Sequence, residues 1–263
     1  MKLTYLLIIF INCISTDEKQ FIPELNGGSQ KQFYKYTDPK AKDLVRLVED
    51  LENSSVSFTG EFSMKINSGE NLKDSNSLKG KIYFDKSSGK VKIQLMEPFF
   101  GLIISQLISD GNSIQIKSSG SSNITTLRMG DILLTDPTTR KNIIIPYPVI
   151  HYSIVQNFSK EFKSNPTYLS PDEKKILVKK KSDDEYYYTF YEKGLESLEV
   201  YSKEKDLRAI ATVPENYRKS DHPPSRIITR VTDRNKKDTS RVDIQYTNIK
   251  KSVEISPQIF KLN

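Results

Sequence analysis

The strongest constraint on the fold is an alternation of apolar and polar residues that starts at Ser55 and runs to Ile66. Successive strand residues point to opposite faces, so this run predicts a long strand with one dry and one solvated face. Further strands are predicted at residues 80–84, 90–96, 102–109, 113–117, 175–180, 185–191, 197–202, 207–213, 226–232, 241–247 and 252–255. Together they predict a mainly β (α+β) fold built on one large curved antiparallel sheet, an incomplete or half barrel.

Two helices are predicted outside these strands. Asp38 can cap a helix that has Pro39 at its first position, and apolar residues then recur at helical spacing as far as Leu51. Pro148 can start a second helix, which is apolar on most of its sides as far as Phe158. A helix of that composition must be covered, and the concave face of the sheet is its natural cover. We therefore expect helices over the concave face and a single domain at residues 38–263.

The amino terminus has the layout of a secretory signal, with Lys2 followed by an apolar run that ends near Cys13. The run is too short to span a bilayer, which needs about 20 apolar residues. An apolar run that ends at a lone cysteine resembles a bacterial lipoprotein signal. In that class the signal peptide is cleaved off before the cysteine, which becomes the first mature residue and carries acyl chains. We expect a signal peptide at residues 1–12 and a lipidated tether at 13–37, anchored through Cys13. The alternative is an ordinary cleaved signal with an incidental cysteine.

The composition argues against most enzymes. A single cysteine excludes an internal disulfide framework and a cysteine-cluster metal site. His151 and His222 are the only histidines, and no catalytic signature surrounds the serines and aspartates. The 40 basic and 33 acidic residues are interleaved, which indicates a mildly basic surface rather than a nucleic-acid stripe. We expect no catalytic residues, cofactor, metal or nucleic-acid partner; a hydrolase would need a clustered nucleophile and base.

The turn between the strands at 90–96 and 102–109 reads Glu97-Pro98-Phe99-Phe100-Gly101. Proline and glycine suit a turn, but two adjacent phenylalanines at a hairpin tip are unusual because tips face water. Each Phe gains about 1.5–3 kcal/mol on leaving water, so an exposed pair favours a membrane or a partner. The alternative is a pair folded back under the sheet.

Three motifs carry a resemblance to a known family. The tip Pro98, Phe99, Phe100 and Gly101 follows two strands and precedes a third. Ile145-Pro146-Tyr147-Pro148 precedes an apolar helix, and Ser256–Phe260 forms a distinctive ending. Over residues 38–260 this order resembles the LolA/LolB lipoprotein-localisation family, and most closely its LolB branch of outer-membrane lipoprotein receptors. There, a Pro-apolar-Gly tip helps to place cargo in the membrane.

The resemblance implies a dry concave surface for acyl chains, each methylene of which adds about 0.8 kcal/mol to the free energy of burial. The implied cavity lining is Val56, Phe58, Phe62, Met64, Ile82, Phe84, Val91, Ile93 and Leu95. The implied lid is Val149, Ile150, Tyr152, Ile154 and Val155. Ordinary core packing is the alternative for each of these residues, because the apolar face of a strand has the same sequence pattern whether it contacts a lipid or a helix.

The function implied is that of a membrane-anchored bacterial lipoprotein that binds acyl chains and assists lipoprotein insertion at the outer membrane. Its expected partners are the acyl chains of lipoproteins or lipids, a periplasmic LolA-like carrier, and the membrane through Cys13. The expected location is the cell envelope, with a monomeric protein on the outer membrane facing the periplasm. The alternative is a lipid- or glycolipid-binding lipoprotein, or a scaffold, without transfer activity.

Overall fold

The computed structural model describes residues 33–68, 76–97, 99–128, 130–135, 142–218, 223–233 and 238–262. The expected signal peptide, Cys13, most of the tether, Pro98 and His222 lie outside these residues. None of the helices in the described ranges is long and apolar enough to cross a membrane.

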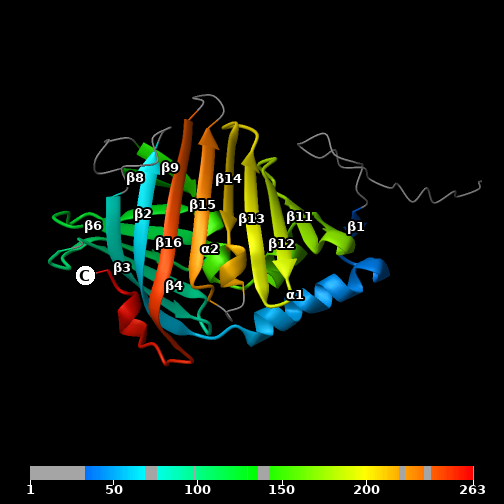
Figure 1. Ribbon diagram of the computed structural model, residues 1–263, viewed down its shortest axis with the longest axis horizontal. Helices are drawn as coiled ribbons and strands as arrows, with labels where there is room; N and C mark the ends of the chain where they lie inside the picture. The colour runs from blue at the N-terminus through cyan, green and yellow to red at the C-terminus, as the bar shows by residue number, and fades with distance from the viewer. Residues whose placement is uncertain are drawn as a thin grey trace, which may run out of the picture. The chain divides into compact units, whose positions relative to one another are not determined.

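Within the described residues, fourteen strands form one antiparallel sheet in the order β1-β10-β11-β12-β13-β14-β15-β16-β2-β3-β4-β5-β6-β7, and β8 pairs with β9 in a separate hairpin. The strands are β1 Tyr34–Lys35, β2 Phe58–Ser68, β3 Asn76–Asp85, β4 Lys90–Met96, β5 Ile103–Ser109, β6 Ser113–Ser118, β7 Thr125–Arg128, β8 Asp131–Thr135, β9 Asn142–Pro146, β10 Thr167–Ser170, β11 Lys175–Lys179, β12 Glu185–Tyr191, β13 Gly194–Ser202, β14 Leu207–Thr212, β15 Arg226–Asp233 and β16 Asp238–Lys251. The predicted large antiparallel sheet is confirmed, and it is open, because β1 and β7 do not pair with each other. Figure 1 shows how it bends.

The first helix forms where it was expected. Asp38 accepts a hydrogen bond from the backbone N–H of Lys40 (2.9 Å) and caps a short 3-10 helix, which leads into α1 at Lys42–Ser54. Satisfying an otherwise orphan N–H in this way favours helix initiation at Asp38. The apolar face of α1 is buried, with Leu44, Val48 and Leu51 in the core.

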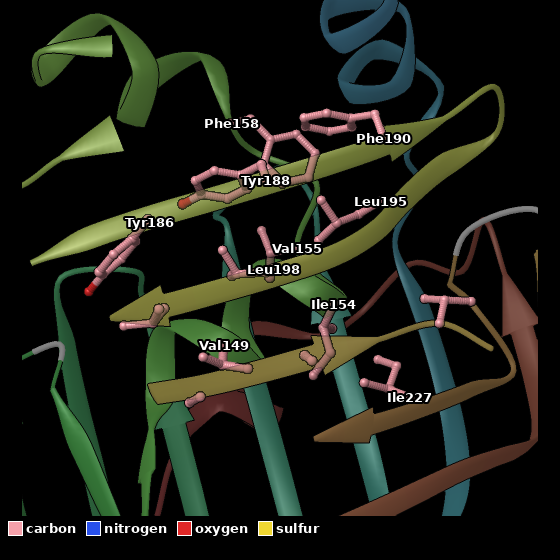
Figure 2. Packing of buried hydrophobic residues seen from close by; sticks show 14 of the residues in the cluster. Val149, Ile154, Val155, Phe158, Tyr186, Tyr188, Phe190, Leu195, Leu198 and Ile227 are labelled. Carbon is pink, nitrogen blue, oxygen red and sulfur yellow. The ribbon is translucent and has the colours of Figure 1, made fainter. Parts of the chain in front are cut away.

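The second helix is shorter than predicted. Helix α2 spans Tyr147–Ile154, and Val155 is already extended; a separate helix, α3, spans Ser159–Ser164. Helix α2 packs against β13 and β14 on the inner side of the bend (Figure 1). Figure 2 shows Val149 and Ile154 of α2, with Val155 just after it, among inward side chains of the sheet such as Leu198 and Ile227.

Aromatic packing explains why the chain bends after α2. The ring of Phe158 stacks on Phe162 with a centroid separation of 5.9 Å and meets Tyr188 and Phe190 edge-on, at 5.9 and 5.4 Å. Edge-to-face and offset pairs of this kind add about 0.5–1.5 kcal/mol beyond the area they bury. A straight helix through Phe158 is therefore less favourable than a break at Val155 that seats this ring over β12 (Figure 2).

Several strand boundaries differ from the predictions; β3, β13 and β16, for example, are each longer than expected. Tyr34–Lys35, expected in the tether, pairs with β10, so the sheet begins before Asp38. The strand predicted at 252–255 is absent, because Ser252 has a left-handed backbone (φ 55°) that ends β16 at Lys251. Strands β1, β7, β8, β9 and β10 were not predicted.

Candidate functional site

A cavity of about 390 Å³ lies between the dry face of the sheet, helix α2 and the β8–β9 hairpin. Its wall comprises Phe62, Met64, Ile66, Leu78, Ile82, Ile93, Leu95, Ile104, Ser105, Leu107, Ile116, Ser118, Ile132, Leu133, Tyr147, Ile150, Ile154, Ile244 and Tyr246. None of these side chains carries a charge at neutral pH. The volume is within the range of about 300–1,000 Å³ for small-molecule pockets, and the wall suits a hydrocarbon ligand.

Strand register builds the floor of this cavity. Phe62 lies opposite Gly80 on β3 and opposite Tyr246 on β16, and its ring meets the ring of Tyr246 edge-on at 6.1 Å. Gly80 leaves the room that the Phe62 ring occupies, because a Cβ on Gly80 would lie 2.2 Å from the Cζ of Phe62. The glycine is thus needed for a close approach between side chain and backbone.

The structure places the predicted lining residues in two groups. Phe62, Met64, Ile82, Ile93 and Leu95 lie on the cavity wall.

The other four lie elsewhere. Phe58, Phe84 and Val91 are fully buried in the core, where the rings of Phe58 and Phe84 pack 5.6 Å apart and fill the hollow at that end of the strands. Val56 precedes β2 and lines a shallow groove beside α1.

The predicted lid residues also divide. Ile150 and Ile154 face the cavity from α2. Val149 is buried in the core, and Tyr152 and Val155 line a polar cavity on the other side of the helix. Because successive helical residues point about 100° apart, α2 cannot turn Val149, Ile150, Tyr152 and Ile154 to the same side, and Val155 lies beyond the end of the helix.

More than half of the cavity wall was not predicted from the sequence. The missed residues are Ile66, Leu78, Ile104, Ser105, Leu107, Ile116, Ser118, Ile132, Leu133, Tyr147, Ile244 and Tyr246. Their signal was available for Ile244 and Tyr246, which alternate within a strand that was predicted. Local alternation does not reveal the order of the strands, so it could not show that β16 lies beside β2.

The hydroxyls of the cavity are neutral. Burial raises the pKa of Tyr147 and of Tyr246 well above the usual range of a phenol. Neither side chain therefore ionises at physiological pH, and the cavity offers no charge to a ligand.

The polar cavity beyond α2 has a volume of about 430 Å³ and is lined by Lys86, Asp110, His151, Tyr152 and Glu161, among others. His151 is 4% exposed, and burial lowers its pKa to about 4, although Asp110 acts in the opposite direction. The imidazole is therefore neutral at pH 7. Among the described residues, no three His, Cys, Asp or Glu side chains are grouped so that they could hold a metal ion.

The β4–β5 loop presents both phenylalanines to solvent. The side chains of Phe99 and Phe100 are 89% and 84% exposed. One carboxylate oxygen of Glu97 accepts the N–H of Phe99 (2.8 Å), and the other accepts the N–H of Phe100 (2.6 Å). Gly101 closes the turn in the left-handed region (φ 69°), which glycine adopts at little cost. The loop therefore has its own hydrogen-bonded framework, with both rings pointing away from the core.

Several exposed apolar side chains lie on this loop or on the cavity wall. In the described ranges the large exposed apolar side chains are Phe99, Phe100, Leu102, Ile103, Ile104, Ile124, Leu127 and Leu133. Ile104 and Leu133 are also part of the cavity wall, so the cavity reaches the surface on the side of the molecule that carries these residues. A solvated protein rarely leaves such a set uncovered without a binding role.

The fold is similar to that of a LolA superfamily protein from Nitrosomonas europaea, with a TM-score of 0.52 and 12% identity over 84% of this chain and 97% of that one. It is also similar to a structure from Vibrio parahaemolyticus described as an outer membrane lipoprotein-sorting protein domain, with a TM-score of 0.44 and 8% identity over 83% of this chain and 94% of that one. No protein-family model matches the sequence, and the search of curated proteins gives no match. The first similarity shows a LolA-like fold.

Proposed function

We propose that this protein holds the acyl chains of lipoproteins or lipids in its cavity and helps to transfer them into a membrane. The observation that carries the proposal is an uncharged, apolar cavity that reaches the surface beside a hydrogen-bonded loop with two solvent-exposed phenylalanines. The LolA-like fold supports it, since the Nitrosomonas structure with a similar fold is described as a LolA superfamily protein.

The proposal includes a location and an anchor. Cys13 would carry acyl chains that hold the protein on the outer membrane, facing the periplasm, and a soluble periplasmic carrier would deliver the cargo. In this respect the protein would act as LolB does, as a binding protein and not as an enzyme. The mass of the mature amino terminus from cells tests the anchor: an unmodified Cys13, or none, removes it from the proposal.

Binding is tested by titration with a fluorescent fatty acid. Leu95 faces the cavity, whereas its neighbour Gln94 faces the other side of the sheet and lies 3.4 Å from the side chain of Gln106. Leu95→Trp should weaken binding about tenfold or more, because filling the space of two methylenes costs the ligand about 1.6 kcal/mol of burial. Gln94→Trp is the matched control and should bind normally. Equal binding by both variants would place the ligand outside this cavity.

Transfer is tested with protein preloaded with an acylated peptide and then mixed with phospholipid vesicles. Phe99→Glu with Phe100→Glu should leave loading intact and slow delivery, because each ring loses about 1.5–3 kcal/mol of membrane burial. In cells the same variant should leave lipoproteins short of the outer membrane. Normal sorting with this variant would refute the insertion role.

A second candidate function keeps the cavity and drops the transfer: an envelope lipoprotein that only holds a lipid or glycolipid. The uncharged, apolar wall supports retention as well as delivery. Wild-type protein that loads cargo and never releases it to vesicles would favour this alternative.

A further inference from the structure

The β6–β7 loop lies at the same end of the sheet as the phenylalanine loop. Strands β5 and β6 pair antiparallel, with Ser105 opposite Ser118, so the chain leaves β6 where it enters β5. A backbone hydrogen bond from Ser119 to the carbonyl of Ile104 (2.7 Å) continues this pairing past the strand end. The loops at 97–102 and 119–124 are therefore neighbours.

Ile124 gives the second loop an apolar residue at its end. Residues 119–123 are serine, glycine and asparagine, yet Ile124 is 48% exposed. Hydrogen bonds hold the loop: the N–H of Ser121 to the carbonyl of Ser118 (3.2 Å), and the N–H of Asn123 to the hydroxyl of Ser121 (3.1 Å). Gly120 makes the turn with a positive φ of 77°. Like the phenylalanine loop, the β6–β7 loop is therefore held by internal hydrogen bonds and exposes an apolar side chain, here a single isoleucine.

The charges at this end are favourable for an anionic surface. Lys79 lies opposite Met96 at the end of β4, and Lys117 lies opposite Gln106, so a lysine flanks the β4–β5 hairpin on each side. The carboxylate of Glu97 is turned back onto the amides of its own loop. Basic side chains beside an apolar surface are attracted to the negative potential of anionic lipids.

We infer that the protein docks on an anionic phospholipid bilayer through both loops at once, with Ile124 as a second insertion point beside Phe99 and Phe100. This inference rests on the proposed function and adds its lipid partner and its docking geometry. Two insertion points restrict the orientation of the sheet against the membrane to rotation about the line that joins them, whereas a single loop leaves the tilt free in every direction. They bring Ile104, which belongs to both the exposed set and the cavity wall, close to the bilayer.

The experiment uses the full chain and single-tryptophan reporters, because the sequence contains no tryptophan. The variants are Phe99→Trp, Ile124→Trp and, as a control, Asn112→Trp in the turn at the opposite end of the β5–β6 hairpin. Each is mixed with vesicles that contain brominated acyl chains, made of phosphatidylcholine alone or with one third phosphatidylglycerol. Quenching by bromine reports contact at the labelled site even where another part of the chain holds the protein on the vesicle.

We expect the fluorescence at positions 99 and 124 to shift to the blue and to be quenched at least twofold, more strongly with phosphatidylglycerol, and that at position 112 to stay unchanged. Quenching at 99 without quenching at 124 would overturn the two-loop inference and leave the proposed function standing. Quenching at neither position would overturn both. Equal quenching with and without phosphatidylglycerol would overturn the preference for anionic lipid.

Discussion

The contact between Gly80 and the Phe62 ring gives the sharpest test of the structure. A Cβ on Gly80 would lie 2.2 Å from the Cζ of Phe62 and 2.6 Å from the backbone oxygen of Gln94. Carbon atoms in contact sit about 3.5 Å apart or more, so Gly80→Ala must displace the ring by about 1.3 Å while also straining a backbone contact. The ring can move only against Tyr246 and into the cavity.

Overpacking of this kind costs about 1–3 kcal/mol. In a domain of this size each kcal/mol lowers the melting temperature by about 2–4 °C, so we expect a loss of about 2–12 °C in thermal denaturation. The displaced ring also narrows the cavity, so binding of a fluorescent fatty acid should weaken.

Gly60 on the neighbouring strand supplies the matched control. Its Cβ would meet the side chain of Ile249 at 3.4 Å and that of Ile82 at 3.6 Å, which is ordinary contact. Gly60→Ala should therefore be neutral, or stabilising by about 0.4–1 kcal/mol through the unfolded chain. If Gly80→Ala were as stable as Gly60→Ala, the packing of Phe62 over Gly80 would be wrong.

Three further predictions concern polar contacts. Glu97→Gln supplies one acceptor oxygen where two amides now bond. A hydrogen bond contributes about 1 kcal/mol, so hydrogen exchange at Phe99 and Phe100 should become about fivefold faster while the melting temperature stays unchanged. Lys92 is buried, which lowers its pKa, and its Nζ donates to two carbonyls near the carboxyl terminus (2.9 and 2.7 Å). Lys92→Met should therefore accelerate amide hydrogen exchange at residues 257–261. Unchanged hydrogen exchange at these residues would contradict the contact. His151 has a pKa of about 4 in the folded state against 6.5 when free. Between these pH values the unfolded chain binds a proton at His151 that the folded chain does not. The free energy of unfolding should therefore fall by up to about 3 kcal/mol as the pH drops from 6.5 to 4. Urea unfolding across that range, with His151→Gln as the comparison, should show a slope that the variant lacks.

The sheet was largely predictable because alternation is a local signal. Strand β4 at Lys90–Met96 and strand β12 at Glu185–Tyr191 have the predicted boundaries. Strand β9 was missed because Ile143-Ile144-Ile145 is a continuous apolar run without a period. Strand β7 was missed because its four residues are all exposed and carry no dry face.

The site was predictable only in part, for a physical reason. Alternation shows which side chains of a strand point to the dry face of the sheet, and by this signal Phe62 and Phe84 are equivalent. The bend of the sheet and the position of α2 then decide that Phe62 meets empty space whereas Phe84 meets the ring of Phe58. That decision depends on contacts between distant parts of the chain, which no local pattern records.

The separate pairing of β8 with β9 has a mechanical consequence. Within the described residues the fourteen-stranded ladder ends at β7, and the hairpin leads directly into α2 without joining that ladder. Among the described residues, hairpin and helix are therefore held against the main sheet by side-chain packing and not by strand pairing. Under the proposed function, a thicker acyl chain would be accommodated by repacking of these side chains, with no hydrogen bond of the main ladder broken.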